Sequence, residues 1–89
     1  MDLLILAHLV SSYDEWKAVF DADADAQSAW ISGEVLVAQA NNTTAMIVAY
    51  GVDMEGMAAF MGTPEFAERT AGHVEGHTVY TISELPPPA

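Results

Sequence analysis

The chain of 89 residues has no cysteine and only two basic side chains, Lys17 and Arg69, against 13 acids. The lack of cysteine excludes disulfides, thiolate chemistry and cysteine-based metal sites. The formal net charge of −11 argues against binding to nucleic acid or to an anionic membrane surface, because both attract basic patches. No apolar run approaches the roughly 18 residues of a membrane-spanning helix. The hydrophobic fraction of 52% predicts a globular protein.

The excess of acids has two interpretations. One is colloidal stability, since surface charge keeps a small domain with an apolar interior in solution. The other is adaptation to salty surroundings, where acidic surfaces with little lysine are common. The second interpretation predicts that stability rises with added salt, because salt screens the self-repulsion of the chain.

Residues 1–85 are predicted to form one domain, because the chain is too short for a second core. Residues 86–89 are a proline-rich tail. The start of the chain is apolar but carries Asp2 and no basic residue, so it reads as a first strand and not as a signal peptide. We expect a cytoplasmic protein.

Three predicted strands contain continuous apolar runs, at residues 3–6, 35–38 and 46–49. A strand with one solvated face alternates apolar and polar residues, whereas a strand covered on both faces is apolar throughout. Two helical segments can cover only one face of a small sheet. The other face therefore needs a second cover, and we expect a second copy of the same sheet.

The strands are predicted at residues 3–10, 30–39, 45–52 and 74–85, with a polar turn at 41–44 that joins the middle two as a hairpin. A helix is predicted over 12–29, where Ser12 and Glu15 have the spacing of a capping box. A second helical region covers 53–72, and Gly62-Thr63-Pro64 interrupts it. The order is that of a ferredoxin-like βαββαβ fold of the α+β class, with an antiparallel sheet and both helical regions on one face.

Residues 8–21 also resemble a known family. They contain His8-Leu9-Val10, followed by Tyr13-Asp14 and Trp16-Lys17, and small dimeric α/β-barrel proteins often open with such a strand and helix. This superfamily includes the antibiotic biosynthesis monooxygenases, and the resemblance extends over nearly the whole chain. It implies a homodimer whose two sheets pack into a barrel, with an apolar cavity between sheet and helices in each subunit. The fold hosts unrelated chemistries, so the resemblance alone assigns no activity.

His8 is the first candidate for chemistry. Its predicted strand face also carries Leu4, Leu6 and Val10, so it is a polar group among apolar neighbours. Because a histidine titrates near neutral pH, His8 could act as a general base or bind a ligand by a hydrogen bond. The alternative is a structural histidine whose ring is satisfied by the backbone or by a partner group.

Two other polar features have structural explanations. His73 and His77 are four residues apart, which on a strand separates them by about 13 Å, so no shared metal is expected. His77 could still point into a cavity. Glu34 interrupts an apolar strand and is either exposed near the strand end or paired, because a buried carboxylate needs a partner.

Three functional hypotheses remain open. The first is a homodimer that binds a small apolar or aromatic molecule, with neither cofactor nor metal; its candidate ligand-binding residues are Trp16, Phe20, Tyr50, Phe60 and His77. The second is a cofactor-independent monooxygenase or isomerase in which His8 accepts a proton. The third is a structural dimer without a ligand.

Overall fold

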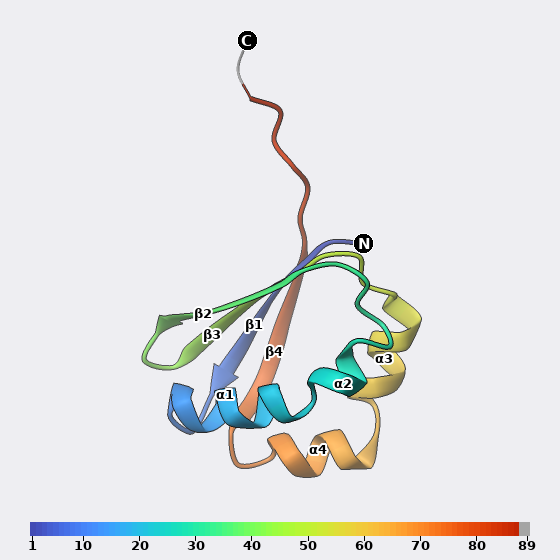
Figure 1. The fold of residues 1–89 in the computed structure, drawn as a ribbon. Coiled ribbons are helices and arrows are strands. Elements are labelled where there is room, and N and C mark those ends of the chain that lie inside the picture. Colours follow the sequence, from blue (N-terminus) through green and yellow to red (C-terminus); the bar gives the residue numbers. More distant parts are fainter. Residues whose placement is uncertain (88–89) are drawn as a thin grey trace.

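The computed structural model describes residues 1–87 of the chain (Figure 1). In this part, four strands and four helices follow one another as β1 (Leu3–Leu9), α1 (Tyr13–Ala22), α2 (Ala24–Gln27), β2 (Val35–Asn41), β3 (Thr44–Ala49), α3 (Met54–Met61), α4 (Pro64–Thr70) and β4 (Val74–Thr81). None of the helices within residues 1–87 is long and apolar enough to cross a membrane. Of the predicted tail, Pro88 and Ala89 lie outside the described residues.

The strands form one sheet in the order β2-β3-β1-β4, and all neighbours are antiparallel. The central strand β1 pairs with β3 and β4, for example Leu4 with Val48 and with Tyr80. The helices lie on one side of this sheet (Figure 1). The predicted ferredoxin-like α+β fold is therefore confirmed.

The helices begin where capping side chains predict. The Ser12 hydroxyl accepts a hydrogen bond from the backbone N–H of Glu15, which is the N-cap half of the predicted capping box, and donates one to the Glu15 carboxylate in place of the Ser12 backbone N–H. Asp53 caps α3, and Thr63 caps α4 with Pro64 at its start. These three caps fix where α1, α3 and α4 begin, and so how the helices meet the sheet.

Two predicted boundaries are wrong. The predicted helix over 12–29 breaks at Asp23, whose carboxylate lies 3.1 Å from the Arg69 guanidinium at the end of α4. The predicted strand over 30–39 begins only at Val35. Before that point, the backbone of Gly33 packs so closely on Tyr50 that a Cβ would lie 2.6 Å from the Tyr50 carbonyl oxygen. The chain there is irregular, apart from a single bridge between Ile31 and Val52.

The last two strands in the chain, β3 and β4, also end differently from the prediction. The third strand covers Thr44–Ala49 instead of 45–52, because Gly51 turns the chain with a φ of 68° that favours glycine. The last strand ends at Thr81 and not at residue 85. Residues 82–87 continue away from the body as an extended segment (Figure 1).

The two faces of the sheet differ in their cover. The covered face, toward the helices, holds the buried core side chains Leu3, Ile5, Ala7, Ala45, Ile47 and Ala49. The open face carries Leu4, Leu6, Leu36, Met46, Val48 and Tyr80, which share a side because they lie opposite one another in the strand pairing. These side chains are half-buried or exposed; Leu36 and Tyr80 are each 49% exposed. The predicted second apolar face is thus present.

Candidate functional site

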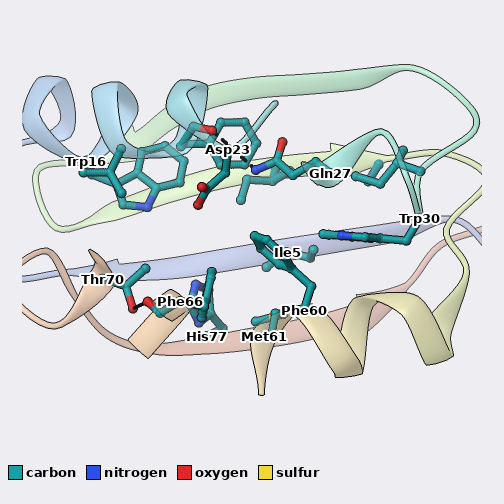
Figure 2. Close-up of a pocket in the computed structure, with 15 residues that line it drawn as sticks. Ile5, Trp16, Asp23, Gln27, Trp30, Phe60, Met61, Phe66, Thr70 and His77 are labelled. Atoms are coloured by element: carbon teal, nitrogen blue, oxygen red, sulfur yellow. Dashed lines mark hydrogen bonds between the residues drawn. The ribbon is translucent and has the colours of Figure 1, made fainter. Parts of the chain in front are cut away.

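A cavity lies between the covered face of the sheet and the helices. Its floor is formed by Ile5, Ile47 and Ala49 of the sheet. Its walls are formed mainly by aromatic side chains. Trp16, Asp23 and Gln27 lie along one side, and Phe60, Phe66 and His77 along the other, with Trp30 at one end (Figure 2). The cavity is therefore a slot between helices and sheet with a largely apolar lining.

The aromatic rings form two rows. On α1, the ring centroids of Trp16 and Phe20 are 5.1 Å apart. In the second row, Trp30 contacts Phe60 at 5.5 Å, Phe60 contacts Phe66 at 5.3 Å, and Phe66 contacts His77 at 6.0 Å. Such tilted pairs hold each other in place, so the walls are preformed surfaces for a flat apolar molecule.

His77 is the histidine of the cavity. It lies on β4 opposite Ala7, a residue of the covered face. Desolvation by burial, with a further contribution from the nearby charge of His8, lowers the pKa of His77 below its ordinary value of 6.5. The ring is therefore neutral at pH 7, where one nitrogen donates a hydrogen bond and the other accepts one.

The charged groups at the cavity neutralise each other. Asp23 is 9% exposed, and its carboxylate pairs with Arg69. Gln27 donates a hydrogen bond to the Phe20 carbonyl oxygen, and Thr70 donates one to that of Phe66. These polar side chains are largely occupied within the protein, so they contribute little attraction for a charged ligand.

Trp30 differs from the other polar residues of the lining. Its indole Nε1 is buried and has no hydrogen-bond partner. Every other buried side-chain nitrogen or oxygen atom within residues 1–87 has one. The ring projects from one end of the cavity toward its middle (Figure 2). A buried donor without a partner is rare in proteins, so this nitrogen is a candidate contact for a bound molecule.

The structure brings together four of the six residues predicted for the site. Trp16, Phe20, Phe60 and His77 line the cavity. His8 and Tyr50 do not. His8 belongs to the opposite face of the sheet, where its Nε2 lies 2.7 Å from the Thr78 hydroxyl, and Tyr50 is 38% exposed at the end of β3.

The cavity is narrow. The cavity has a volume of about 60 Å³ and is partly open to solvent. One water needs about 10–15 Å³ of such a cavity volume, so the cavity has room for several waters or a comparably small molecule. A polycyclic ligand would require the lining side chains to move.

Several lining residues were not predicted from the sequence, including Asp23, Gln27, Trp30 and Phe66. Helical spacing could have indicated Asp23 and Gln27, because Trp16, Phe20, Asp23 and Gln27 follow one another at intervals of three or four residues. Trp30 was assigned to a strand, which concealed its place at the end of the cavity. Within residues 1–87, no group of three or more His, Asp or Glu side chains is placed to hold a metal ion.

The chain matches no protein-family profile and no curated protein. Its fold matches the crystal structure of SnoaB, a cofactor-independent oxygenase from Streptomyces nogalater, with a TM-score of 0.60 at 13% identity, over 98% of this chain and 96% of SnoaB. It also matches the crystal structure of an antibiotic biosynthesis monooxygenase with a TM-score of 0.50 at 12% identity, over 97% and 100% of the two chains. The resemblance read from residues 8–21 is confirmed as a likeness of fold, and the likeness extends no further than the fold.

Proposed function

We propose that this protein is a homodimer of the dimeric α/β-barrel type, in which each subunit binds a small apolar or aromatic molecule in the cavity. The observation that supports ligand binding is the lining: two rows of aromatic rings enclose a slot with few free polar groups. Small-molecule sites are commonly concave, apolar and sparingly polar in this way. The room available favours a ligand of about one ring.

The open face supports the dimer. Leu6 and Met46 lie side by side at its centre, and Leu36 and Tyr80 are exposed toward its outer strands. A contiguous apolar surface on a small protein marks an interaction site. Because a two-fold dimer pairs a surface with itself, one apolar sheet face can cover another.

The ligand hypothesis is tested by filling the cavity. Ala49 is fully buried in its floor, so Ala49→Leu occupies the space that a ring would take. Calorimetric titration with ethylbenzene should show binding to the unchanged protein and at least a tenfold weaker affinity for the variant. Ala59→Leu, the same substitution on the exposed surface of α3, should bind as the unchanged protein does. Equal affinities in all three proteins would remove the cavity from the proposal.

A second candidate function is a cofactor-independent monooxygenase or isomerase that uses His8 as proton acceptor. The shared fold with SnoaB, itself a cofactor-independent oxygenase, supports this alternative. His8 would have to act on a substrate at the open face, whereas His77 is the histidine beside a substrate in the cavity. Oxygen uptake with phenolic polycycles, compared among the unchanged protein, His8→Ala and His77→Ala, distinguishes the two. Unchanged rates in His8→Ala would exclude His8.

The third possibility is a structural dimer without ligand. It predicts a dimer in solution that binds neither ethylbenzene nor any phenolic compound. The titration described for Ala49→Leu therefore also separates this possibility from the first.

A further inference from the structure

The cavity lining contains a buried hydrogen-bond donor without a partner, the indole N–H of Trp30. Buried polar groups in proteins nearly always have a partner, because an unpaired group loses its hydration without compensation. Two other polar side chains of the lining have partners within the chain: Gln27 donates a hydrogen bond to the Phe20 carbonyl oxygen, and Thr70 donates one to the Phe66 carbonyl oxygen. An unpaired donor among the residues that line a cavity is a candidate partner for an acceptor on a bound molecule.

The position of Trp30 is fixed by its surroundings. Its backbone N–H donates to the Gln27 carbonyl oxygen at 3.1 Å, and its carbonyl oxygen accepts from Asp53 at 2.8 Å. Gly56 on α3 lies directly against it, since a Cβ at Gly56 would be 2.6 Å from the Trp30 Cβ. The ring itself packs on Phe60. The donor is thus held at a defined point of the cavity before any ligand arrives.

We infer that Trp30 determines the specificity of the cavity by donating a hydrogen bond to an acceptor oxygen on an uncharged, single-ring ligand. This inference rests on the proposed ligand-binding function. A carbonyl, ether or phenolic oxygen on such a molecule supplies the missing acceptor while its ring lies between the aromatic rows.

The charge of the surroundings selects an uncharged ligand. Arg69, the cation nearest the lining, pairs with Asp23. The chain as a whole carries a formal charge of −11, which repels an anion. A cation would meet an indole N–H and a neutral His77 at the walls, and the one carboxylate there already has a partner.

The test compares acetophenone with ethylbenzene, which have similar shapes and differ by the carbonyl oxygen. Calorimetry on the unchanged protein should give about tenfold tighter binding of acetophenone, the usual effect of one hydrogen bond. Trp30→Phe removes the donor and keeps an aromatic ring, so the preference should disappear. Trp16→Phe makes the same substitution in the other row and should retain it.

A readout on the unmodified protein keeps the inference testable if the variants fold poorly. The chain has two tryptophans, hence two indole N–H signals in a proton–nitrogen spectrum. Acetophenone should shift the Trp30 signal downfield and ethylbenzene should not. Gly56→Ala, which displaces Trp30 but keeps its donor, should reduce the preference for acetophenone.

The outcomes separate the two proposals. Binding of both compounds with equal affinity, and no shift of the indole signal, would overturn the role of Trp30 and leave the ligand-binding function standing; a cavity water would then satisfy the donor. Binding of neither compound would overturn the ligand-binding function, and the inference with it.

Discussion

The two faces of the sheet have similar composition and opposite surroundings. On β1, Leu3, Ile5 and Ala7 of the covered face are at most 5% exposed, while the neighbouring Leu4 and Leu6 on the open face stay partly exposed. Both sets are apolar, so composition alone does not separate them. The helices cover one set and leave the other open (Figure 1). A strand without alternation therefore indicates two covers, and within one chain only the first is visible.

The two proposed functions belong to different faces of the sheet, ligand binding to the covered face and dimer contact to the open face. The covered face holds the cavity, which lies between the aromatic rows and whose lining contains an unpaired donor. The open face carries a group of partly exposed apolar side chains, a feature typical of interaction sites. The proposed ligand binding and the proposed dimer can then be tested separately by substitutions on opposite sides of the same strand.

The largest effect is expected from a charge on the open face. Leu6→Asp places a carboxylate at the centre of the proposed dimer interface, and two-fold symmetry introduces it twice. Burial of an unpaired charge costs several kcal/mol, so we expect at least a hundredfold weaker dimer with the subunit fold retained. Analytical ultracentrifugation measures the dissociation constant. Ala59→Asp, on the exposed surface of α3, is the control, and equal dissociation constants for both variants would contradict the interface.

Leu3 and Leu4 give a matched pair on the two faces. Leu3→Ala opens a cavity in a fully buried position and should lower the free energy of unfolding by about 2–5 kcal/mol. Leu4→Ala should weaken the dimer instead. Because only the dimer has an unfolding midpoint that depends on protein concentration, the urea midpoint of this variant should change less with concentration than that of the unchanged protein. Identical concentration dependence in all three proteins would contradict the division between the faces.

A smaller effect is expected from pH through His77. Because its pKa in the folded protein is lowered, the unfolded chain binds a proton more readily, and stability should fall as the pH falls below about 6.5. The slope from this group is at most about 1.4 kcal/mol per pH unit. His77→Phe should therefore lose less stability than the unchanged protein between pH 7.5 and 5.5 in urea titrations. Parallel pH profiles would show that His77 is not buried in its neutral form.

The smallest effect concerns the excess of acidic residues. If self-repulsion limits stability, the melting temperature should rise by a few degrees between low and moderate sodium chloride, because exposed charges are screened within a Debye length of about 10 Å. Differential scanning fluorimetry measures it. A falling melting temperature would favour colloidal stability as the reason for the acids.

Local signals predicted much of the fold. The apolar run at the start of the chain is β1, the cap at Ser12 starts α1, and the polar turn after Asn41 closes the hairpin of β2 and β3. Each of these features depends on residues close together in the sequence. Trp16 and Phe20 were also predicted as ligand-binding residues. They lie four residues apart on α1, so helical spacing makes them neighbours, and both line one wall of the cavity.

Features that depend on distant residues were not predictable. The helix breaks at Asp23, which pairs with Arg69 46 residues away, and β2 starts late because Gly33 packs on Tyr50. His8 shares a face with Leu4 and Leu6, as predicted. Which face of β1 lies toward the helices could not be read from the sequence, because both alternating sets are apolar. The unpaired nitrogen of Trp30 exists only in the assembled cavity, so no local pattern contains it.

The mass of the particle in solution tests the central claim most directly. Light scattering coupled to size exclusion, at micromolar protein and moderate salt, should report twice the 9.5 kDa of one chain, because the open face of one subunit covers that of the other. A stable particle of 9.5 kDa would contradict the account, since the apolar open face would then remain in contact with water.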